Sequence, residues 1–268
     1  MRHSKKIEGY VNTVIIDFQN ETLVKKFNSG ITYTRSNFES ASEEYEKEKK
    51  MLKAFETLLK GCISAPKLLS YDDEKREIKM EYIKGENFHV FMLKNCNKFY
   101  FDKRLFQVFS DLGKNLAKLH NENLQTKNGL KTVIHGDLVS HNFLFKKENT
   151  KINMYLIDPC GFKKAPYADL ASFLSIFYLL NFVYRITFGK KFFQLKKVFL
   201  QKYIEVCKYD FEKKELKKHV LNYLEKKAKR NPRRKAFWKK PIYFLYANWV
   251  DSRKRRAYNR IEKYGLEI

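Results

Sequence analysis

The chain has 268 residues, of which 44% are hydrophobic and 16% aromatic. This length and composition allow a large buried core, as one domain or a bilobed pair, and exclude intrinsic disorder for most of the chain. The net charge is +25: residues 185–268 carry 26 Lys and Arg against 8 acidic residues, and residues 1–184 carry 29 against 22. A field of this sign attracts nucleic acid, phosphorylated glycolipid or an anionic membrane surface. Its uneven distribution argues against a uniform Lys and Glu enrichment as the whole explanation.

The cysteines and the start of the chain indicate a cytoplasmic protein. No two of the four cysteines form a Cys-x-x-Cys pair, and the first residues do not resemble a secretory signal, so we expect reduced thiols. The longest apolar run extends from Phe173 to Tyr184. A membrane span needs about 20 such residues, so the run predicts a buried helix instead.

The first elements along the chain are predicted strands followed by a charged helix. Residues 9–27 are typical of two or three β-strands separated by a turn. Residues 40–60 have apolar side chains at helical spacing, and Ser40 or Ser42 is suited to cap the helix.

Two more strands and a second helix are predicted next. Residues 67–71 and 76–83 alternate as strands do, and the acidic residues between them favour a turn. From residue 101 to residue 119, apolar side chains recur on one face of a predicted helix. The pair Asn128-Gly129 then favours a turn before the most informative part of the sequence.

That part is the stretch Val-Ile-His-Gly-Asp-Leu-Val-Ser-His-Asn-Phe-Leu-Phe at residues 133–145. Asp137 and Asn142 lie five residues apart in a short predicted loop, and Asp158 follows the apolar run Tyr-Leu-Ile. Phosphoryl transfer from a metal-bound nucleotide needs one carboxylate to accept a hydroxyl proton. It also needs a carboxamide and a second carboxylate to hold magnesium. The three residues supply this set.

These motifs resemble the catalytic loop and the metal-binding aspartate of the protein-kinase-like superfamily. The triplet His-Gly-Asp resembles the branch that contains aminoglycoside and choline phosphotransferases, RIO-type kinases and lipopolysaccharide core (heptose or Kdo) kinases. The resemblance implies a bilobed α+β fold. Residues 1–82 would form a small antiparallel sheet with one helix, and residues 83–268 would form a mainly helical lobe. It also implies an ATP-dependent kinase that uses Mg²⁺.

The resemblance assigns a role to each residue of the motifs. Asp137 would be the catalytic base, and Asn142 and Asp158 would bind both the metal and the nucleotide through it. His135 is expected to pack under the loop as a structural residue. Asp169 would open the next helix and accept backbone hydrogen bonds from the catalytic loop.

The predicted small lobe offers two candidates for each nucleotide-binding charge. Lys25 is favoured over Lys26 as the phosphate-contacting lysine, because the family pattern is apolar-apolar-Lys-x-apolar. The two point to opposite faces of a strand, so only one can face the nucleotide. Glu48 is favoured over Glu44, one helical turn earlier, as the lysine's partner.

The remaining nucleotide contacts are predicted from the backbone. Glu81 and Tyr82 would contact adenine through main-chain groups where the two lobes join. Gly9-Tyr-Val-Asn12 replaces a glycine-rich loop and resembles the Gly-x-x-Asn of small-molecule kinases. Pro159 stands where protein kinases have Phe, and because proline fixes φ, the Phe switch of regulated protein kinases is not expected.

The acceptor is predicted from charge, because no motif is found in the last 90 residues. Residues 226–240 include nine basic residues and no acidic ones. Aromatic, aliphatic and basic side chains occur together in this part of the chain and suit the headgroup region of an anionic membrane. They are Phe237, Trp238, Lys239, Lys240, Ile242, Tyr243, Phe244, Tyr246, Trp249, Arg253, Lys254, Arg255 and Arg256. The preferred hypothesis is a sugar or anionic glycolipid acceptor at the inner face of the cytoplasmic membrane. The alternatives are a RIO-like protein kinase bound to RNA, with nucleic acid the less favoured partner, another small-molecule kinase, and a nucleotide-binding scaffold without catalysis.

Overall fold

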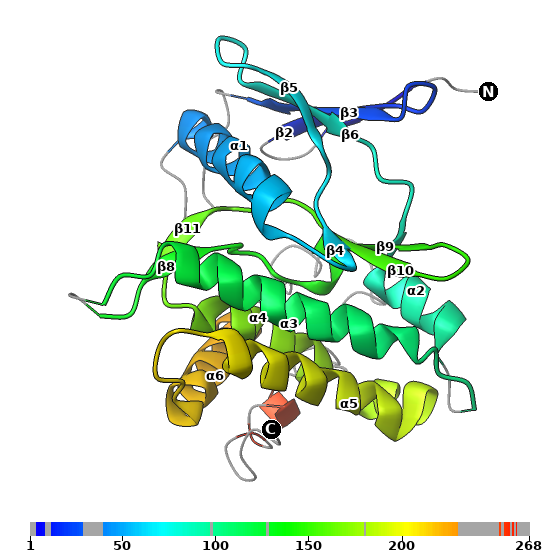
Figure 1. The fold of residues 1–268 in the computed structure, drawn as a ribbon, viewed down its shortest axis with the longest axis vertical. Helices are drawn as coiled ribbons and strands as arrows, with labels where there is room; N and C mark the ends of the chain where they lie inside the picture. The colour runs from blue at the N-terminus through cyan, green and yellow to red at the C-terminus, as the bar shows by residue number, and fades with distance from the viewer. Residues whose placement is uncertain are drawn as a thin grey trace, which may run out of the picture.

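The computed structural model describes residues 4–8, 12–28, 40–96, 99–126, 129–179 and 181–229, together with residues 252, 255–257, 259 and 261. Its elements form a five-stranded sheet with one long helix beneath it, and a larger part made of helices and two small sheets (Figure 1). None of the described helices is long and apolar enough to span a membrane. The predicted α+β architecture is confirmed.

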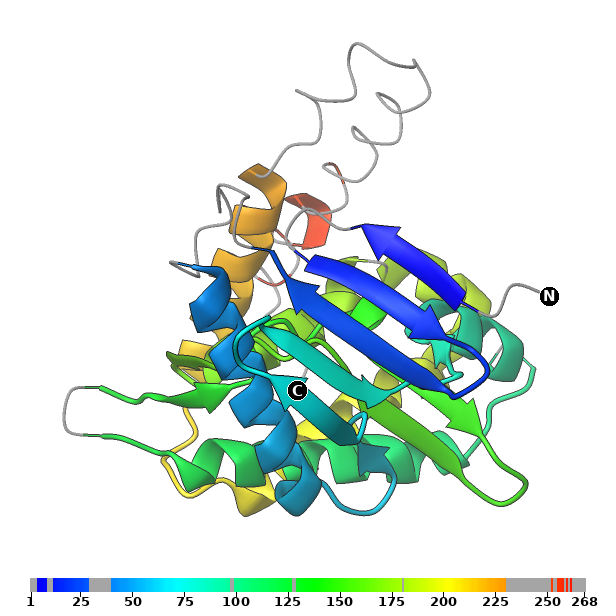
Figure 2. The ribbon, with the colours of Figure 1, turned by 90° about the horizontal axis from the view of Figure 1, so that it is seen from above.

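The first layer is an antiparallel sheet of order β1-β2-β3-β6-β5. Figure 2 shows this sheet as a layer over the helical part. Its strands are β1 (Ser4–Glu8), β2 (Asn12–Asp17), β3 (Thr22–Phe27), β5 (Leu68–Asp72) and β6 (Glu77–Glu81). Strand β1 lies before residue 9, outside the range in which strands were predicted. Its five residues are all exposed, so it lacks the apolar alternation by which a strand is detected.

Helix α1 (Ala41–Leu58) begins after Ser40, whose side chain accepts a hydrogen bond from the Glu43 N–H at 3.1 Å. Ser40 is therefore the cap, and Ser42 lies inside the helix. The buried face of α1 packs on β3 and β6 in a small apolar cluster made of Phe27, Ala41, Tyr45, Leu52, Ile78 and Met80. This packing fixes α1 beneath the sheet and directs one of its faces toward the rest of the molecule.

The larger part contains helices α2 (Phe88–Asn95), α3 (Arg104–Glu122), α4 (Tyr167–Leu179), α5 (Asn181–Val206) and α6 (Lys213–Lys229). One small sheet has the order β4-β10-β9-β7, with strands Ile63–Ser64, Ile152–Leu156, Phe143–Lys147 and Glu86–Asn87. The other pairs β8 (Thr132–Ile134) with β11 (Phe162–Lys164). Strand β4 precedes the predicted lobe boundary at residue 82 yet pairs with β10 of the later part.

The apolar run from residue 173 to residue 184 does not form one helix as predicted. Helix α4 ends at Leu179 and α5 begins at Asn181, so the run is divided between two helices. Residues 173–178 are all buried, and an apolar run reports burial alone, so the pattern gives no sign of where α4 ends. In the core, Phe173 of α4 lies 4.2 Å from Phe199 of α5, measured between ring centroids.

Helices α3 and α5 approach each other closely at Gly113. A Cβ atom added to this glycine would lie 2.3 Å from the carbonyl oxygen of Phe199 and 3.1 Å from the nitrogen of Tyr203. Both are main-chain atoms, so no side chain can turn away to make room. The absence of a side chain at residue 113 therefore sets the distance between the two helices.

We expect Gly113→Ala to destabilise the protein, although alanine is the better helix former by about 1 kcal/mol. Forcing α5 away from α3 should cost about 1 to 3 kcal/mol beyond that gain. Urea unfolding measures the difference, and Lys118→Ala on the exposed side of α3 is the control, expected to change stability by less than about 0.5 kcal/mol. A Gly113→Ala variant as stable as the wild type would contradict the close approach.

Candidate active site

The catalytic loop lies between β8 and β9 and brings Asp137 and Asn142 together. The Asn142 side-chain amide donates to the main-chain oxygen of Asp137 at 2.8 Å and to its carboxylate at 3.0 Å. Asn142 is 3% exposed, whereas the side chain of Asp137 is 40% exposed. The buried carboxamide therefore orients a carboxylate that solvent, or an acceptor, can reach.

Asp158 follows β10 and carries the second carboxylate. Its φ is +59°, a left-handed conformation that is uncommon for residues other than glycine, although aspartate tolerates it better than most. The side chain is 55% exposed, and Oδ1 lies 2.5 Å from the Lys25 Nζ. The charge of Lys25 lowers the pKa of Asp158 below its ordinary value, so the carboxylate is ionised at neutral pH.

Lys25 on β3 joins this carboxylate to a second one on α1. Its ammonium is buried and lies 2.6 Å from Glu48 Oε2 as well as 2.5 Å from Asp158. Burial alone would lower the pKa of Lys25, but the two carboxylates outweigh it and raise the pKa above its ordinary value. Burial raises the pKa of Glu48 to about 7, against the opposing charge of Lys25.

The structure separates the pairs of candidates that the sequence left open. Lys26 points to the other face of β3 and pairs with Glu77 at 2.5 Å. Glu44 accepts a hydrogen bond from the Asn12 side chain at 3.1 Å, so it ties the start of β2 to α1. Lys25 and Glu48 are the two that meet. Residues 9–11 of the predicted Gly-x-x-Asn lie outside the described residues.

The predicted adenine contact is Glu81, the last residue of β6, together with Tyr82 after it. The N–H of Glu81 donates to the Lys67 oxygen at 2.9 Å, and the N–H of Tyr82 donates to the Glu21 oxygen at 2.8 Å. Both donors are therefore used by the sheet and cannot face a nucleotide. The next N–H, that of Ile83, has no hydrogen-bond partner among the described residues. The sequence analysis did not select Ile83. Its N–H group stands out only because main-chain hydrogen bonding within the sheet ends at Tyr82, and residue types do not show where that happens.

Two histidines flank the loop in different surroundings. His135 is fully buried, and its ring stacks on Phe55 with centroids 6.1 Å apart. Burial lowers its pKa, so the ring is neutral, as suits a structural residue under the loop. His141 is 72% exposed, and its Nε2 lies 3.8 Å from the Asp137 carboxylate.

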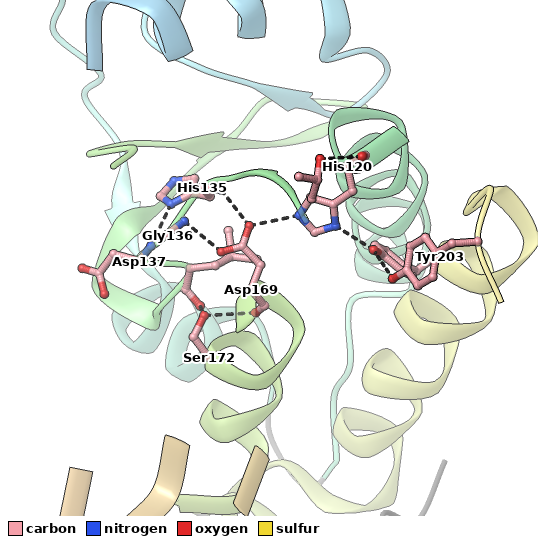
Figure 3. A network of polar contacts seen from close by, with 10 residues as sticks. His120, His135, Gly136, Asp137, Asp169, Ser172 and Tyr203 are labelled. Carbon is pink, nitrogen blue, oxygen red and sulfur yellow. Dashed lines mark hydrogen bonds and ion pairs between the residues drawn. The ribbon is translucent and has the colours of Figure 1, made fainter. Parts of the chain in front are cut away.

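Asp169, near the start of α4, holds the loop from below (Figure 3). Its carboxylate accepts hydrogen bonds from the N–H groups of His135 at 2.7 Å and Gly136 at 2.8 Å. His120 lies 3.2 Å away on the other side. The role predicted for Asp169 matches this geometry, but sequence reasoning missed His120. The available signal was a polar side chain directly after the apolar stripe that ends at Leu119.

Gly136 is required by its position between His135 and Asp137. Its φ is +88°, and an added Cβ would lie 2.8 Å both from the Cys160 Cβ and from the ring of Phe162. The loop is thus pressed against the segment that follows Asp158, and a larger residue has no space there. Burial raises the pKa of the Cys160 thiol, so this cysteine is a packing residue beside the site.

The oxygen donors fit a magnesium–nucleotide complex. No group of three or more His, Cys, Asp or Glu side chains within the described parts of the chain could hold a metal ion alone. Magnesium, however, is commonly bound by one or two protein oxygen ligands, with nucleotide phosphates and water completing its shell. Asp158 and Asn142 are hard oxygen donors of this kind.

The comparisons with known proteins agree with this geometry. The sequence profile of the ecdysteroid kinase-like family matches residues 14–184, more than half of the chain. A stretch of 93 residues is 28% identical to the EKC/KEOPS complex subunit bud32 of Dictyostelium discoideum. It covers 35% of this chain and 33% of that protein, so the chain spans about a third of the length of this curated relative.

Two solved structures share the fold across nearly the whole chain. The GDP complex of aminoglycoside 2'-phosphotransferase-IIIa has a TM-score of 0.59 at 11% identity, covering 96% of this chain and 93% of that one. The Plasmodium vivax ethanolamine kinase has a TM-score of 0.55 at 12% identity, covering 98% and 84%. The predicted resemblance to the protein-kinase-like superfamily is confirmed.

Removing the buried ammonium should make stability depend on pH. In Lys25→Met the Glu48 carboxyl loses its ion-pair partner, so the free energy of unfolding should fall by about 3 kcal/mol at pH 8. A carboxyl whose pKa is raised by folding binds its proton more tightly in the folded state. The stability it contributes is therefore lost as the pH rises through that pKa. The deficit relative to wild type should be smaller at pH 5.5 than at pH 8, as measured by urea unfolding.

Lys26→Met is the matched control for this experiment. It removes a lysine from the same strand whose ion pair is partly exposed, so its cost should stay within about 1 kcal/mol at both pH values. Equal losses for the two variants, or a Lys25→Met deficit that shrinks as the pH rises, would contradict the assignment.

Proposed function

The chain belongs to the ecdysteroid kinase-like family and is a kinase-like phosphotransferase, and we propose that it transfers the γ-phosphate of ATP to a hydroxyl group of a small molecule. The observation that carries the proposal is the meeting of Lys25, Glu48 and Asp158, joined to the Asp137–Asn142 pair by a hydrogen bond of 3.1 Å from the N–H of Ile157 to the main-chain oxygen of Asn142. In the proposed site Lys25 is the group for the phosphates, Asp158 and Asn142 supply oxygen donors for a metal, and the exposed carboxylate of Asp137 remains for the acceptor.

Each residue has a distinct role in the proposed reaction. Lys25, held by Glu48, would contact the phosphates, and Asn142 and Asp158 would hold Mg²⁺. The bound metal would neutralise the charge that develops on the transferred group. Asp137 orients the acceptor hydroxyl and takes its proton as the oxygen attacks the γ-phosphorus, while the bond from that phosphorus to the bridging oxygen breaks and ADP leaves with its electron pair. Adenine lies at the segment after β6, beside Glu81 and Tyr82, where the N–H of Ile83 adds a donor.

The proposed division of labour follows the two parts of the chain. Residues 1–82 supply the sheet and α1, which carry the phosphate-contacting pair, and residues 83–268 supply the catalytic loop and the metal ligands. Strand β4 is the exception, because it pairs with β10. This pairing ties the chain between α1 and β5 to the strand that leads to Asp158.

A small-molecule acceptor is favoured by the names of the structural relatives, which act on an aminoglycoside and on ethanolamine. A second candidate is a sugar of an anionic glycolipid, such as lipopolysaccharide core, at the inner face of the cytoplasmic membrane. It is favoured by the net charge of +25 and by its concentration after residue 185. Most of the basic and aromatic residues that suggested it lie outside the described residues; Arg255 and Arg256 lie within them.

Asp137→Asn and Asp158→Asn should fail in different ways. The first should lower kcat by about 100-fold or more while leaving ATP affinity almost unchanged, because only the proton acceptor is lost. The second should also weaken magnesium-dependent ATP binding. A γ-labelled ATP transfer assay with aminoalcohols, sugars and core glycolipid as acceptors, together with calorimetric titration of ATP, measures both effects. Wild-type turnover by Asp137→Asn would remove the base assignment.

The glycolipid candidate predicts binding to anionic vesicles. Neutralising seven basic residues should abolish co-sedimentation with phosphatidylglycerol vesicles, since each contributes about 1 kcal/mol of binding near such a surface. The seven are Lys235, Lys239, Lys240, Arg253, Lys254, Arg255 and Arg256. The control variant neutralises seven exposed lysines elsewhere and should still bind the vesicles. These are Lys5, Lys6, Lys60, Lys75, Lys103, Lys118 and Lys131. Equal binding by both variants, or a wild type that prefers RNA, would rule out the membrane-bound acceptor.

A further inference from the structure

Behind Asp169, away from the proposed nucleotide site, a second series of buried polar groups begins. His120 Nε2 lies 3.2 Å from the Asp169 carboxylate, and His120 Nδ1 lies 2.6 Å from the Tyr203 hydroxyl. The Tyr203 hydroxyl in turn lies 2.8 Å from that of Tyr209. Figure 3 shows His120 between Asp169 and Tyr203, so the catalytic loop is joined to α5 by three side chains.

An ionised Asp169 fixes the direction of the first hydrogen bond of this series. Burial opposes ionisation, but the donors around the carboxylate outweigh it and hold the pKa of Asp169 below its ordinary value. A carboxylate only accepts, so His120 must donate through Nε2. Nδ1 then pairs with the Tyr203 hydroxyl, which can donate to it or accept from it, and the Tyr203 hydroxyl pairs in turn with that of Tyr209. Each group therefore holds the next in place.

Burial makes each link necessary for the one before it. His120, Asp169 and Tyr203 are all 0% exposed, so water cannot replace a missing partner. Without the Tyr203 hydroxyl, Nδ1 of His120 would be a buried polar atom without its hydrogen-bond partner, and the ring would gain by turning toward another one. This change weakens the donor that Asp169 receives.

The two ends of His120 are held by different elements. Its main-chain oxygen accepts from the Thr132 hydroxyl at 2.6 Å, which ties the end of α3 to β8 just before the loop. On the loop's other side, the Ser172 hydroxyl donates to the Leu138 oxygen at 3.2 Å. These bonds fix the main chain but not the ring of His120. The hydrogen bond from Nδ1 to the Tyr203 hydroxyl is what keeps that ring from turning.

We propose that Tyr203 is a positioning residue for the catalytic loop. Its hydroxyl fixes the ring of His120, which holds Asp169 against the N–H groups of His135 and Gly136. Its effect on turnover rests on the proposed kinase function, whereas its effect on the loop does not. Tyr209 extends the series to the surface, where it lines an open hollow with Thr126, Leu130, Cys207, Lys208 and Asp210.

The first test needs no enzymatic activity. Tyr203→Phe keeps the ring and removes the hydroxyl, so hydrogen–deuterium exchange at the amides of His135 and Gly136 should become about tenfold faster. Tyr167→Phe is the matched control, because Tyr167 is also buried and its hydroxyl bonds only the main chain of Asp210 and Glu212. The control should lower the melting temperature by a similar amount and leave exchange in the loop unchanged.

The second test measures turnover of ATP with water as the acceptor. Tyr203→Phe should lower kcat by about tenfold through displacement of Asp137, with the KM for ATP changed by less than about twofold, because no nucleotide contact is touched. His120→Gln keeps a donor toward Asp169 but ends the series there. In that background Tyr203→Phe should have no further effect on kcat, since Tyr203 acts only through His120.

The outcomes separate this proposal from the proposed function. Unchanged exchange in Tyr203→Phe, or equally faster exchange in Tyr203→Phe and Tyr167→Phe, would overturn the positioning role. Additive losses of kcat in the double variant would overturn it as well. A wild-type protein that neither binds nor hydrolyses ATP would instead remove the kinase function, and the exchange experiment would still decide whether Tyr203 positions the loop.

Discussion

The buried ammonium of Lys25 is the group on which the arrangement of the site depends. An isolated charge in the interior costs several kcal/mol, so it must have partners within hydrogen-bond distance. Glu48 and Asp158 are those partners, and they come from α1 and from the segment after β10. One lysine therefore fixes the relation of the sheet, the helix beneath it and the segment after β10. The same requirement brings the proposed phosphate-contacting group and the proposed metal ligand to one place.

The lower half of the site is held by neutral groups and by a single buried carboxylate. Asp169 receives two loop N–H groups, and Asn142 fixes the orientation of Asp137 from the side. The exposed carboxylate of Asp137 thus stands on a loop whose main-chain N–H groups donate to a carboxylate of the protein itself. A site built in this way is positioned before its ligands arrive, which lowers the cost of reaching the reactive geometry.

The sequence predicted what depends on short spacing and missed what depends on distant packing. Asp137, Asn142 and Asp158 could be found because a loop and the strand after it are local. Strand periodicity showed that Lys25 and Lys26 face opposite ways, but only the position of α1 decides which face is buried. His120 and Tyr203 lie 83 residues apart, and no local pattern connects them. The end of α4 at Leu179 was hidden for a related reason, since the sequence stays largely apolar on both sides of this point.

The glycine at residue 113 has a consequence for the precision of the loop. Because the main chains of α3 and α5 touch there, the separation of the two helices is set by contact between hard atoms rather than by flexible side chains. His120 lies two turns further along α3, and Tyr203 is one of the α5 residues at the contact. A hydrogen bond of 2.6 Å between them tolerates a displacement of only about half an ångström. The position of Asp137 relative to an acceptor hydroxyl therefore depends, through His120 and Tyr203, on the missing side chain at Gly113.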